Sequence, residues 1–255
     1  MVDEILIESS KKVFSITLNR PDKLNALNFD MMRQIKKGLI EAEEDETIQL
    51  IVFKSARCRA FSTGFDIQQI LTLPVDQKNA FFKMNDEISE IVLTSEKLYM
   101  SVIRGFAVAA GFAFCLFSDF RIAEHNTDIY FALPEITVGI FPYAVLTLSF
   151  YYLPPSIAVD LIFKGTQLSL SRAINIGFVH SVFSSEEFDK SEKKYIRSII
   201  SQNPSVQRIT KVCYNIERKE VLKRIHMEKE FTQVCLNPES ITRTKIAELK
   251  EKWSQ

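Results

Sequence analysis

The chain has 255 residues, enough for one large domain or two modest ones around a substantial hydrophobic core. Its 32 basic and 32 acidic side chains cancel, so there is no overall positive field to attract nucleic acid or an anionic membrane. Hydrophobic residues make up 46% of the chain and only 7 residues are glycine, which excludes disordered, collagen-like and linker-dominated proteins.

The chain begins with a predicted pair of strands. The apolar runs Ile5–Ile7 and Val13–Leu18 predict two strands that pair across the intervening turn. Residues 28–46 carry apolar side chains at helical spacing, which predicts an amphipathic helix that Asn28 could cap. The apolar run Leu50–Phe53 then predicts a buried strand.

The same alternation continues through the middle of the chain. A helix is predicted over about 77–97, a strand over Tyr99–Ile103, a buried helix from about Ala109 and a strand over Phe120–Ala123. Strands that alternate with helices in this way favour an α/β core with parallel connections.

The chain after about residue 185 has a different pattern, because strand signals end and helical spacing of apolar residues takes over. We therefore expect a core at residues 1–185 and a helical C-terminal segment at residues 186–255, with Asn203–Pro204 and Asn237–Pro238 interrupting the helices. The apolar faces of these helices could pack on the chain's own core or against another copy. The residues that define these faces are Ile209, Val212, Cys213, Ile216, Val221, Leu222, Ile225, Ile246, Leu249 and Trp253.

Metal-binding, disulfide and membrane signals are weak. The four cysteines and three histidines are scattered and contain no Cys-x-x-Cys pair, so neither a structural zinc site nor a disulfide is expected. The acidic N-terminus does not resemble a secretory signal, and the longest apolar run, Phe106–Phe117, is too short to span a bilayer. We therefore expect a cytoplasmic protein that binds no metal, nucleic acid or membrane.

Two segments could expose backbone amides. Residues 59–66 form an irregular turn after a strand, where Gly64 permits a tight turn. Residues 100–111 run from a strand through small residues into a helix, whose first N–H groups have no intrahelical partner. Two such amides aimed at one point would make an oxyanion hole for a thioester carbonyl that becomes an enolate.

Glu135 is the third candidate feature. It lies in the otherwise apolar segment 133–142, where burial would raise its pKa toward that of a useful general base. Taken singly, the three features also have ordinary structural explanations: a turn glycine, close helix packing, and an acidic residue in the first turn of a helix.

The order and spacing of these segments resemble the crotonase superfamily, also called the enoyl-CoA hydratase/isomerase family. The resemblance implies an α/β fold, a crotonase-like spiral of ββα units with a helical C-terminal segment. It also implies an acyl-CoA thioester substrate, in which coenzyme A is the substrate carrier and not a separate cofactor, and a homotrimer or hexamer assembled through the helical tail. The matching segments are residues 18–27, 60–66, 105–119, 134–136, 163–166 and 173–179.

The resemblance also implies particular site residues. It assigns the oxyanion-hole amides to Phe65 and Ala110, and it identifies Ala109 and Ala110 as replacements of the usual glycines. Phe65 and Phe141 are expected nearest to the substrate. Coenzyme A would lie along Lys23, Ala26, Leu27, Ser62, Gly64, Asp66 and Ile67.

The expected reaction depends on the number of carboxylates. Family hydratases use two glutamates on one water; Glu135 matches the second of these, and the first falls on Ala113, which cannot transfer a proton. A single carboxylate is what a double-bond shift needs, so the resemblance favours a Δ3-Δ2-enoyl-CoA isomerase with Glu135 as base. The alternatives are a 2-enoyl-CoA hydratase and a catalytically silent protein that binds CoA or acts in assembly.

Other polar residues leave alternatives open. Tyr143 could be a proton donor or a wall of the acyl pocket, and Asp86, Glu87 and Glu90 could replace the missing acid or form a solvated helix face. Acyl-chain length and the choice between trimer and hexamer are not fixed by the sequence.

Overall fold

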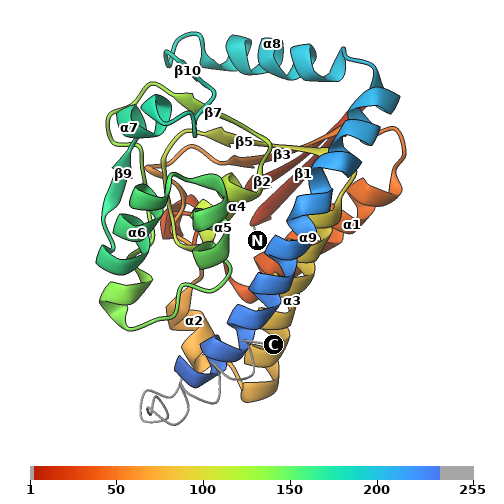
Figure 1. Ribbon diagram of the computed structural model, residues 1–255. Coiled ribbons are helices and arrows are strands. Elements are labelled where there is room, and N and C mark those ends of the chain that lie inside the picture. The colour runs from red at the N-terminus through yellow and green to blue at the C-terminus, as the bar shows by residue number, and fades with distance from the viewer. Residues whose placement is uncertain (1–2, 236–255) are drawn as a thin grey trace.

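The computed structural model describes residues 3–235, whose strands form two sheets (Figure 1). The first sheet has the strand order β1-β2-β3-β5-β7-β10, in which β1 and β2 are antiparallel and the other neighbours are parallel. Its strands are β1 (Ile5–Ser10), β2 (Val13–Leu18), β3 (Leu50–Ser55), β5 (Leu98–Ile103), β7 (Phe120–Glu124) and β10 (Ser181–Phe183).

The second sheet is smaller and has the order β4-β6-β8-β9, with β9 antiparallel to β8. The successive pairs β3–β4, β5–β6 and β7–β8 each give one strand to each sheet before the chain continues into helices. This is the expected spiral of ββα units. The strands of the second sheet are β4 (Ala60–Ser62), β6 (Phe106–Val108), β8 (Tyr130–Ala132) and β9 (Gln167–Ser169).

Helices surround the two sheets. The α-helices are α1 (Phe29–Glu44), α2 (Ile67–Thr72), α3 (Val75–Thr94), α4 (Ala110–Phe117), α5 (Val145–Tyr152), α6 (Pro155–Lys164), α7 (Leu170–Asn175), α8 (Phe188–Ile200) and α9 (Pro204–Cys235). The 3₁₀ helices are η1 (Pro21–Lys23) and η2 (Pro134–Val138).

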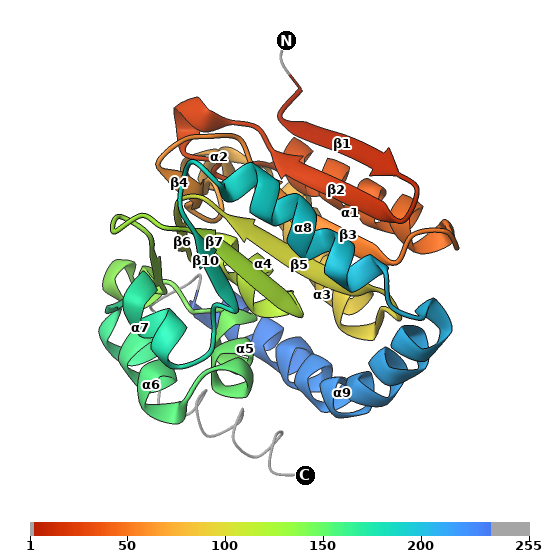
Figure 2. The ribbon, with the colours of Figure 1, turned by 90° about the horizontal axis from the view of Figure 1, so that it is seen from above.

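The central strands of the first sheet are covered on both faces, which explains why they are apolar at consecutive positions. On β3, Leu50 and Val52 belong to a cluster that includes Phe188 of α8, and the alternate residues Ile51 and Phe53 belong to the main core. Figure 2 shows α8 lying across the strands of this sheet. Helices α1, α3 and α4 contribute to the main core on the other side.

The predicted elements of the first half are confirmed, with shifted ends. Asn28 caps α1, because its side-chain oxygen accepts a hydrogen bond from the N–H of Met31 at 2.8 Å. The helix predicted over 77–97 occupies Val75–Thr94, since Pro74 precedes its first turn and Ser95 has an extended backbone (φ −58°, ψ 139°).

The C-terminal segment is helical as far as it is described, and α9 runs beside α3 (Figure 1). Val221 and Ile225 of α9 are buried, whereas Ile209 and Ile216 are 66% and 65% exposed. Part of the predicted apolar face therefore packs on the chain's own core and part faces solvent. The predicted helix residues 246–253 and the interruption Asn237–Pro238 lie outside the described residues, and the division at residue 185 stays a prediction.

A buried charge cluster fastens α9 to the first sheet. Asp119, at the start of β7, accepts hydrogen bonds from the Lys211 ammonium at 2.6 Å and from the Arg218 guanidinium at 3.0 Å. It also accepts the backbone N–H of Tyr99 at 2.8 Å. Burial lowers the pKa of Lys211 to about 8, although the nearby Asp119 charge raises it.

Within residues 3–235, no helix is long and apolar enough to cross a membrane. The same part of the chain contains no group of three or more His, Cys, Asp or Glu side chains arranged to hold a metal ion. Cys58, Cys115 and Cys213 are free thiols, and burial raises the pKa of Cys115 to about 12, which disfavours its thiolate.

Candidate active site

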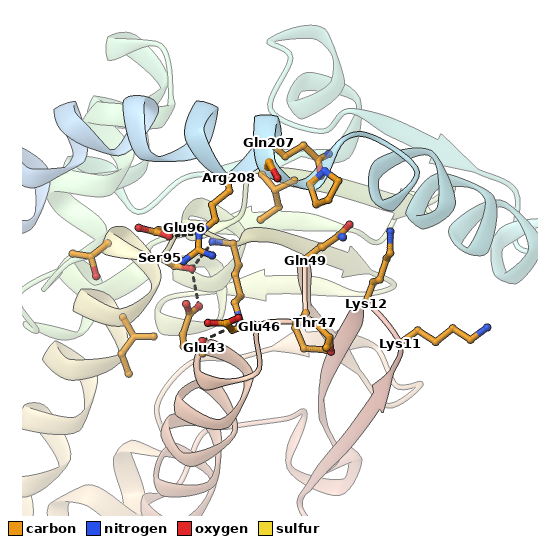
Figure 3. A pocket seen from close by; sticks show the side chains of 17 residues that line it. Lys11, Lys12, Glu43, Glu46, Thr47, Gln49, Ser95, Glu96, Gln207 and Arg208 are labelled. Atoms are coloured by element: carbon orange, nitrogen blue, oxygen red, sulfur yellow. Dashed lines mark hydrogen bonds and ion pairs between the residues drawn. The ribbon is translucent and has the colours of Figure 1, made fainter.

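A polar cavity of about 930 Å³ lies beside the C-terminal end of α1 and the start of α9 (Figure 3). Several of its charged groups hold these elements together. Glu43 accepts hydrogen bonds from the Ser95 hydroxyl at 2.7 Å and the Tyr99 hydroxyl at 2.8 Å, and Arg208 pairs with Glu96. We therefore assign these groups a structural role and place the candidate active site elsewhere.

A second cavity, of about 560 Å³, combines an apolar wall with one carboxyl group. It lies between α2, α3, the β6–α4 turn and the segment that follows β8. Phe65 and Phe141, the two phenylalanines expected nearest to a substrate, both line it. Apolar residues that the sequence did not single out also line it: Ile70, Leu71, Phe82, Val138 and Ile140.

Glu135 supplies the carboxyl group of this cavity. It is the second residue of η2, which Pro134 begins, and the backbone N–H of Ile140 donates to its carbonyl oxygen at 2.9 Å. Its Oε2 is buried and has no hydrogen-bond partner among the described residues. Burial raises the pKa of Glu135 to about 7, so near neutral pH the side chain can both accept and return a proton.

The turn at Gly64 packs directly against the start of α4. A Cβ atom at Gly64 would lie 2.8 Å from the Cβ of Ala109 and 3.0 Å from the amide nitrogen of Ala110. The φ angle of Gly64 is +85°, so both the close approach and the backbone conformation require glycine. The peptide that joins Gly64 to Phe65 is thereby brought next to the Ala110 amide.

Ala109 holds a backbone conformation that favours glycine, with φ 53° and ψ −128°. Its N–H donates to the carbonyl of Ala132 at 3.0 Å, and its carbonyl accepts the N–H groups of Phe112 and Ala113. The N–H groups of Phe65 and Ala110 have no acceptor within the described part of the chain. Both N–H groups are therefore available to an acceptor from a ligand.

A hydrogen-bonded scaffold fixes this corner. The Ser62 hydroxyl donates to the carbonyl of Asn25 at 2.8 Å and accepts the N–H of Gly64 at 3.1 Å. Leu27 forms an isolated parallel bridge with Phe65. Asp66 pairs with Arg20 at 2.7 Å and caps α2; burial acts to raise its pKa, but the bonds from Arg20 and the Gln69 N–H lower it overall.

The seven residues expected along coenzyme A fall into two groups. Ile67 lines the cavity, and Lys23 is exposed on η1. The side chains of Leu27 and Ser62 are fully buried. Leu27 and Ser62 belong to the hydrogen-bonded scaffold, together with Gly64 and Asp66. Ala26 is half-buried and also belongs to this scaffold, because its carbonyl accepts a hydrogen bond from Arg20 at 3.1 Å. Any contact of Leu27 or Ser62 with a ligand would therefore involve the backbone.

The carboxyl groups that could replace the missing acid are not in the cavity wall. Ala113 is a buried residue of α4. Asp86 pairs with Lys229 and Glu87 pairs with Lys36 at 2.8 Å, and neither lines the cavity; Glu90 is exposed on the same helix. Tyr143 does line it, and its hydroxyl is buried with no hydrogen-bond partner among residues 3–235.

Two residues from distant helices lie in the cavity wall or bind the backbone next to it. Phe82 of α3 lines the wall, and Glu228 of α9 binds the backbone at the start of α5. Phe82 could have been suspected from the apolar spacing of its helix. Glu228 carries no local signal, because its partners at Ala144 and Thr147 are 84 and 81 residues away in the sequence.

Comparison with known proteins identifies the family. The sequence model of the enoyl-CoA hydratase/isomerase family matches residues 8–254. The chain therefore belongs to the enoyl-CoA hydratase/isomerase family, as the order of its motifs predicted. Family members are enzymes of acyl-CoA metabolism, and the fold is that of crotonase.

Relatives with different activities in their names match this chain. The chain is 27% identical over 214 residues to a crotonyl-CoA hydratase of Syntrophomonas wolfei, which covers 84% of this chain and 82% of the relative. It is 36% identical over 143 residues to the human mitochondrial 3-hydroxyisobutyryl-CoA hydrolase, covering 55% of this chain and 36% of the relative.

Solved structures support the fold. An enoyl-CoA hydratase/isomerase from Xanthobacter autotrophicus is 26% identical, with a TM-score of 0.82 and coverage of 98% of this chain and 93% of the other. An enoyl-CoA hydratase from Bacillus halodurans has a TM-score of 0.84 at 19% identity, with coverage of 94% and 97%, a likeness of fold alone.

Proposed function

We propose that the protein is an isomerase that converts a 3-enoyl-CoA thioester into the 2-enoyl isomer. The proposal is carried by one observation: Glu135 is the single carboxyl group among the described residues that line the apolar cavity. Ala113, where a second acid would be expected, has no group that can transfer a proton. One carboxyl group is sufficient for a double-bond shift, because the proton that leaves one carbon can be returned to another.

The proposed reaction moves one proton. The Glu135 carboxylate removes a proton from C2, the C2–H electrons form a C1–C2 double bond, and the carbonyl π electrons move onto the thioester oxygen to give a dienolate. The carbonyl then re-forms, the C1–C2 electrons become the C2–C3 double bond, and the C3–C4 electrons take the same proton from the carboxyl group at C4. A pKa of about 7 suits both half-reactions, since neither protonation state is strongly disfavoured near neutral pH.

The backbone amides of Phe65 and Ala110 would stabilise the intermediate. Both would donate to the thioester oxygen, where negative charge develops as the proton leaves. Backbone donors do not depend on the side chain, so alanine at Ala109 and Ala110 preserves the donors while narrowing the space beside them. In the same proposal, coenzyme A lies along the η1 and β4–α2 segments, near Lys23 and Ile67.

The test is a direct assay with purified protein. A 3-enoyl-CoA should give the 2-enoyl isomer, followed by the absorbance of the conjugated thioester and by product chromatography. Glu135→Gln should lose about 10²–10⁴-fold in rate, the usual contribution of a positioned acid–base group. Glu87→Gln is the matched control, because it changes an ion-paired carboxylate outside the cavity. Equal rates for wild type and Glu135→Gln would overturn the assignment.

Hydration of a 2-enoyl-CoA is the second candidate, favoured by the crotonyl-CoA hydratase among the relatives. Loss of conjugated absorbance on adding crotonyl-CoA, with 3-hydroxybutyryl-CoA as product, would support it over isomerisation. Release of free CoA would instead indicate thioester hydrolysis, the activity that the human relative is named for. Acyl-CoA binding without any turnover would support a catalytically silent binding or assembly protein.

We further propose that the chain acts as a homotrimer or hexamer in the cytoplasm. Apolar residues left exposed on α9, such as Ile209 and Ile216, support contact with further copies. Light scattering on the purified protein would separate monomer, trimer and hexamer, and a monomer would overturn the proposed assembly.

A further inference from the structure

Helix α5 begins without a cap from its own segment. Ala144 occupies the N-cap position with φ 62°, a conformation that alanine rarely adopts, and its side chain cannot accept a hydrogen bond. The acceptor comes from α9 instead: Glu228 Oε2 accepts the N–H of Ala144 at 2.7 Å. Its Oε1 accepts the N–H of Thr147 at 2.9 Å and the Thr147 hydroxyl. A buried carboxylate from a distant helix therefore holds the start of α5.

The segment before Ala144 is the wall of the acyl cavity. Ile140, Phe141 and Tyr143 line the cavity, and the N–H of Ile140 donates to the carbonyl of Glu135 at 2.9 Å. This wall is therefore anchored at one end to the backbone of the proposed base and at the other end, through Ala144, to Glu228.

Two residues near Glu228 on α9 contact Phe141 of the cavity wall and Asp86 of helix α3. Phe231, on the same helix, stacks on Phe141 with 6.0 Å between ring centroids. Lys229 pairs with Asp86 of α3, the helix whose Phe82 also lines the cavity. This stretch of α9, residues 228–231, therefore ties together the wall before α5 and the helix α3.

We propose that Glu228 is a positioning residue that fixes the wall Ile140–Tyr143 from α9 and thereby sets the acyl-chain lengths that the site accepts. The inference rests on the proposed function only in taking the ligand to be an acyl-CoA thioester. A wall released at Ala144 can move relative to Glu135 and change the width of the cavity. Short acyl groups make few contacts with that wall, whereas long ones depend on it.

The experiment measures binding of saturated thioesters, which cannot isomerise. Dissociation constants of butanoyl-, octanoyl- and dodecanoyl-CoA are compared for wild type and Glu228→Gln. A glutamine presents an amide N–H₂ to one of the two backbone N–H groups, so the capping arrangement is lost. We expect the ratio of the dodecanoyl to the butanoyl constant to change by about tenfold, the consequence of losing one hydrogen bond to a charged group.

Two further variants separate positioning from general damage. Glu220→Gln makes the same substitution at an exposed ion pair on α9 and should leave the ratio within about twofold. Ala144→Gly, added to Glu228→Gln, lets the backbone hold its left-handed conformation without the cap and should restore most of the ratio. If Glu228→Gln fails to fold, Thr147→Val, which removes the hydroxyl donor, should change the ratio in the same direction.

An unchanged ratio, or equal weakening at every chain length, would overturn the inference, because a purely structural role affects all ligands alike. A different result would show that the proposed isomerase reaction is wrong. A wild-type protein that binds these thioesters but does not isomerise a 3-enoyl-CoA would contradict the proposed function and leave the chain-length test intact.

Discussion

Two buried carboxyl groups lie at opposite ends of one segment, and their surroundings differ. Burial raises the pKa of both Glu135 and Glu228 to about 7. Glu228 accepts hydrogen bonds from two backbone N–H groups and a hydroxyl, whereas Glu135 Oε2 has no partner among the described residues. A raised pKa therefore does not by itself identify a catalytic group. The carboxyl group with an unpartnered oxygen, in the wall of an apolar cavity, is the one suited to chemistry.

The sharpest contrast is expected from neutralising Glu135. Glu135→Gln should lower the rate of the proposed isomerisation by about 10²–10⁴-fold and also stabilise the protein at pH 8. The Glu135 carboxyl group has a pKa of about 7 in the folded protein and an ordinary value of 4.5. Its protonated form therefore adds to the free energy of unfolding below pH 4.5, and this contribution is lost as the pH rises to about 7. The gain for glutamine at pH 8 is of the order of 2–3 kcal/mol. Urea unfolding of both proteins at pH 8 measures it, and a destabilised variant would contradict this picture of Glu135.

The pH dependence of the reaction tests the same group in the wild-type protein. The base is active when deprotonated, so kcat/KM should rise about tenfold per pH unit below pH 7 and level off above it. Initial rates with a 3-enoyl-CoA between pH 5 and pH 9 give the profile. A profile that is flat between pH 5 and pH 7 would mean that Glu135 keeps an ordinary pKa or is not the base.

Glu228 should respond to the same substitution with a smaller gain in stability. Its raised pKa favours glutamine at pH 8 as it does at Glu135, but a backbone N–H at the start of α5 loses its acceptor in a buried place. Glu228→Gln should therefore be less stable than Glu135→Gln by about 1–3 kcal/mol. The measurement is again urea unfolding at pH 8. Equal stabilities of the two variants would show that the two carboxyl groups are equivalent and that the hydrogen bonds of Glu228 contribute little.

The smallest effect is expected at Glu87, whose ion pair with Lys36 is partly exposed. Glu87→Gln should change the free energy of unfolding by less than about 0.5 kcal/mol and the isomerisation rate by less than about twofold. Thermal unfolding measures the change in stability, and the isomerisation assay measures the change in rate. A large loss of rate would restore this residue as a candidate for the missing acid.

Much of the site could be predicted because its parts are local in sequence. The turn at Gly64 and the small residues from Ala109 follow strands directly, so their backbone amides could be expected at the sheet edge from sequence order alone. The proximity of the two turns could not be predicted from sequence order. It depends on the parallel pairing of β4 and β6, which brings Gly64 within contact of Ala110.

Side-chain burial at the site and the exact end of α3 could not be predicted from the sequence pattern. The side chains of Leu27 and Ser62 are fully buried, because the residues after η1 contact β4 and the residue Phe65 that follows it. The sequence does not reveal this burial, and the prediction that coenzyme A lies along these two residues stays a prediction. Helix α3 ends three residues before the predicted end, because the backbone of Ser95 leaves the helical conformation. Lys97 instead turns its ammonium to the carbonyl of Glu43 at 3.0 Å.

The sequence by itself determined the family, the alternation of strands and helices, and Glu135 as the candidate base, because these depend on short motifs and local periodicity. Its scarcity of glycine also marked Gly64, where a turn and a close approach both demand that residue. Only the tertiary structure decided which carboxyl groups have partners. Glu228 meets Ala144, and Asp86 meets Lys229, through the packing of α9 across the core, and contacts between residues so far apart in the chain leave no periodic pattern in the sequence.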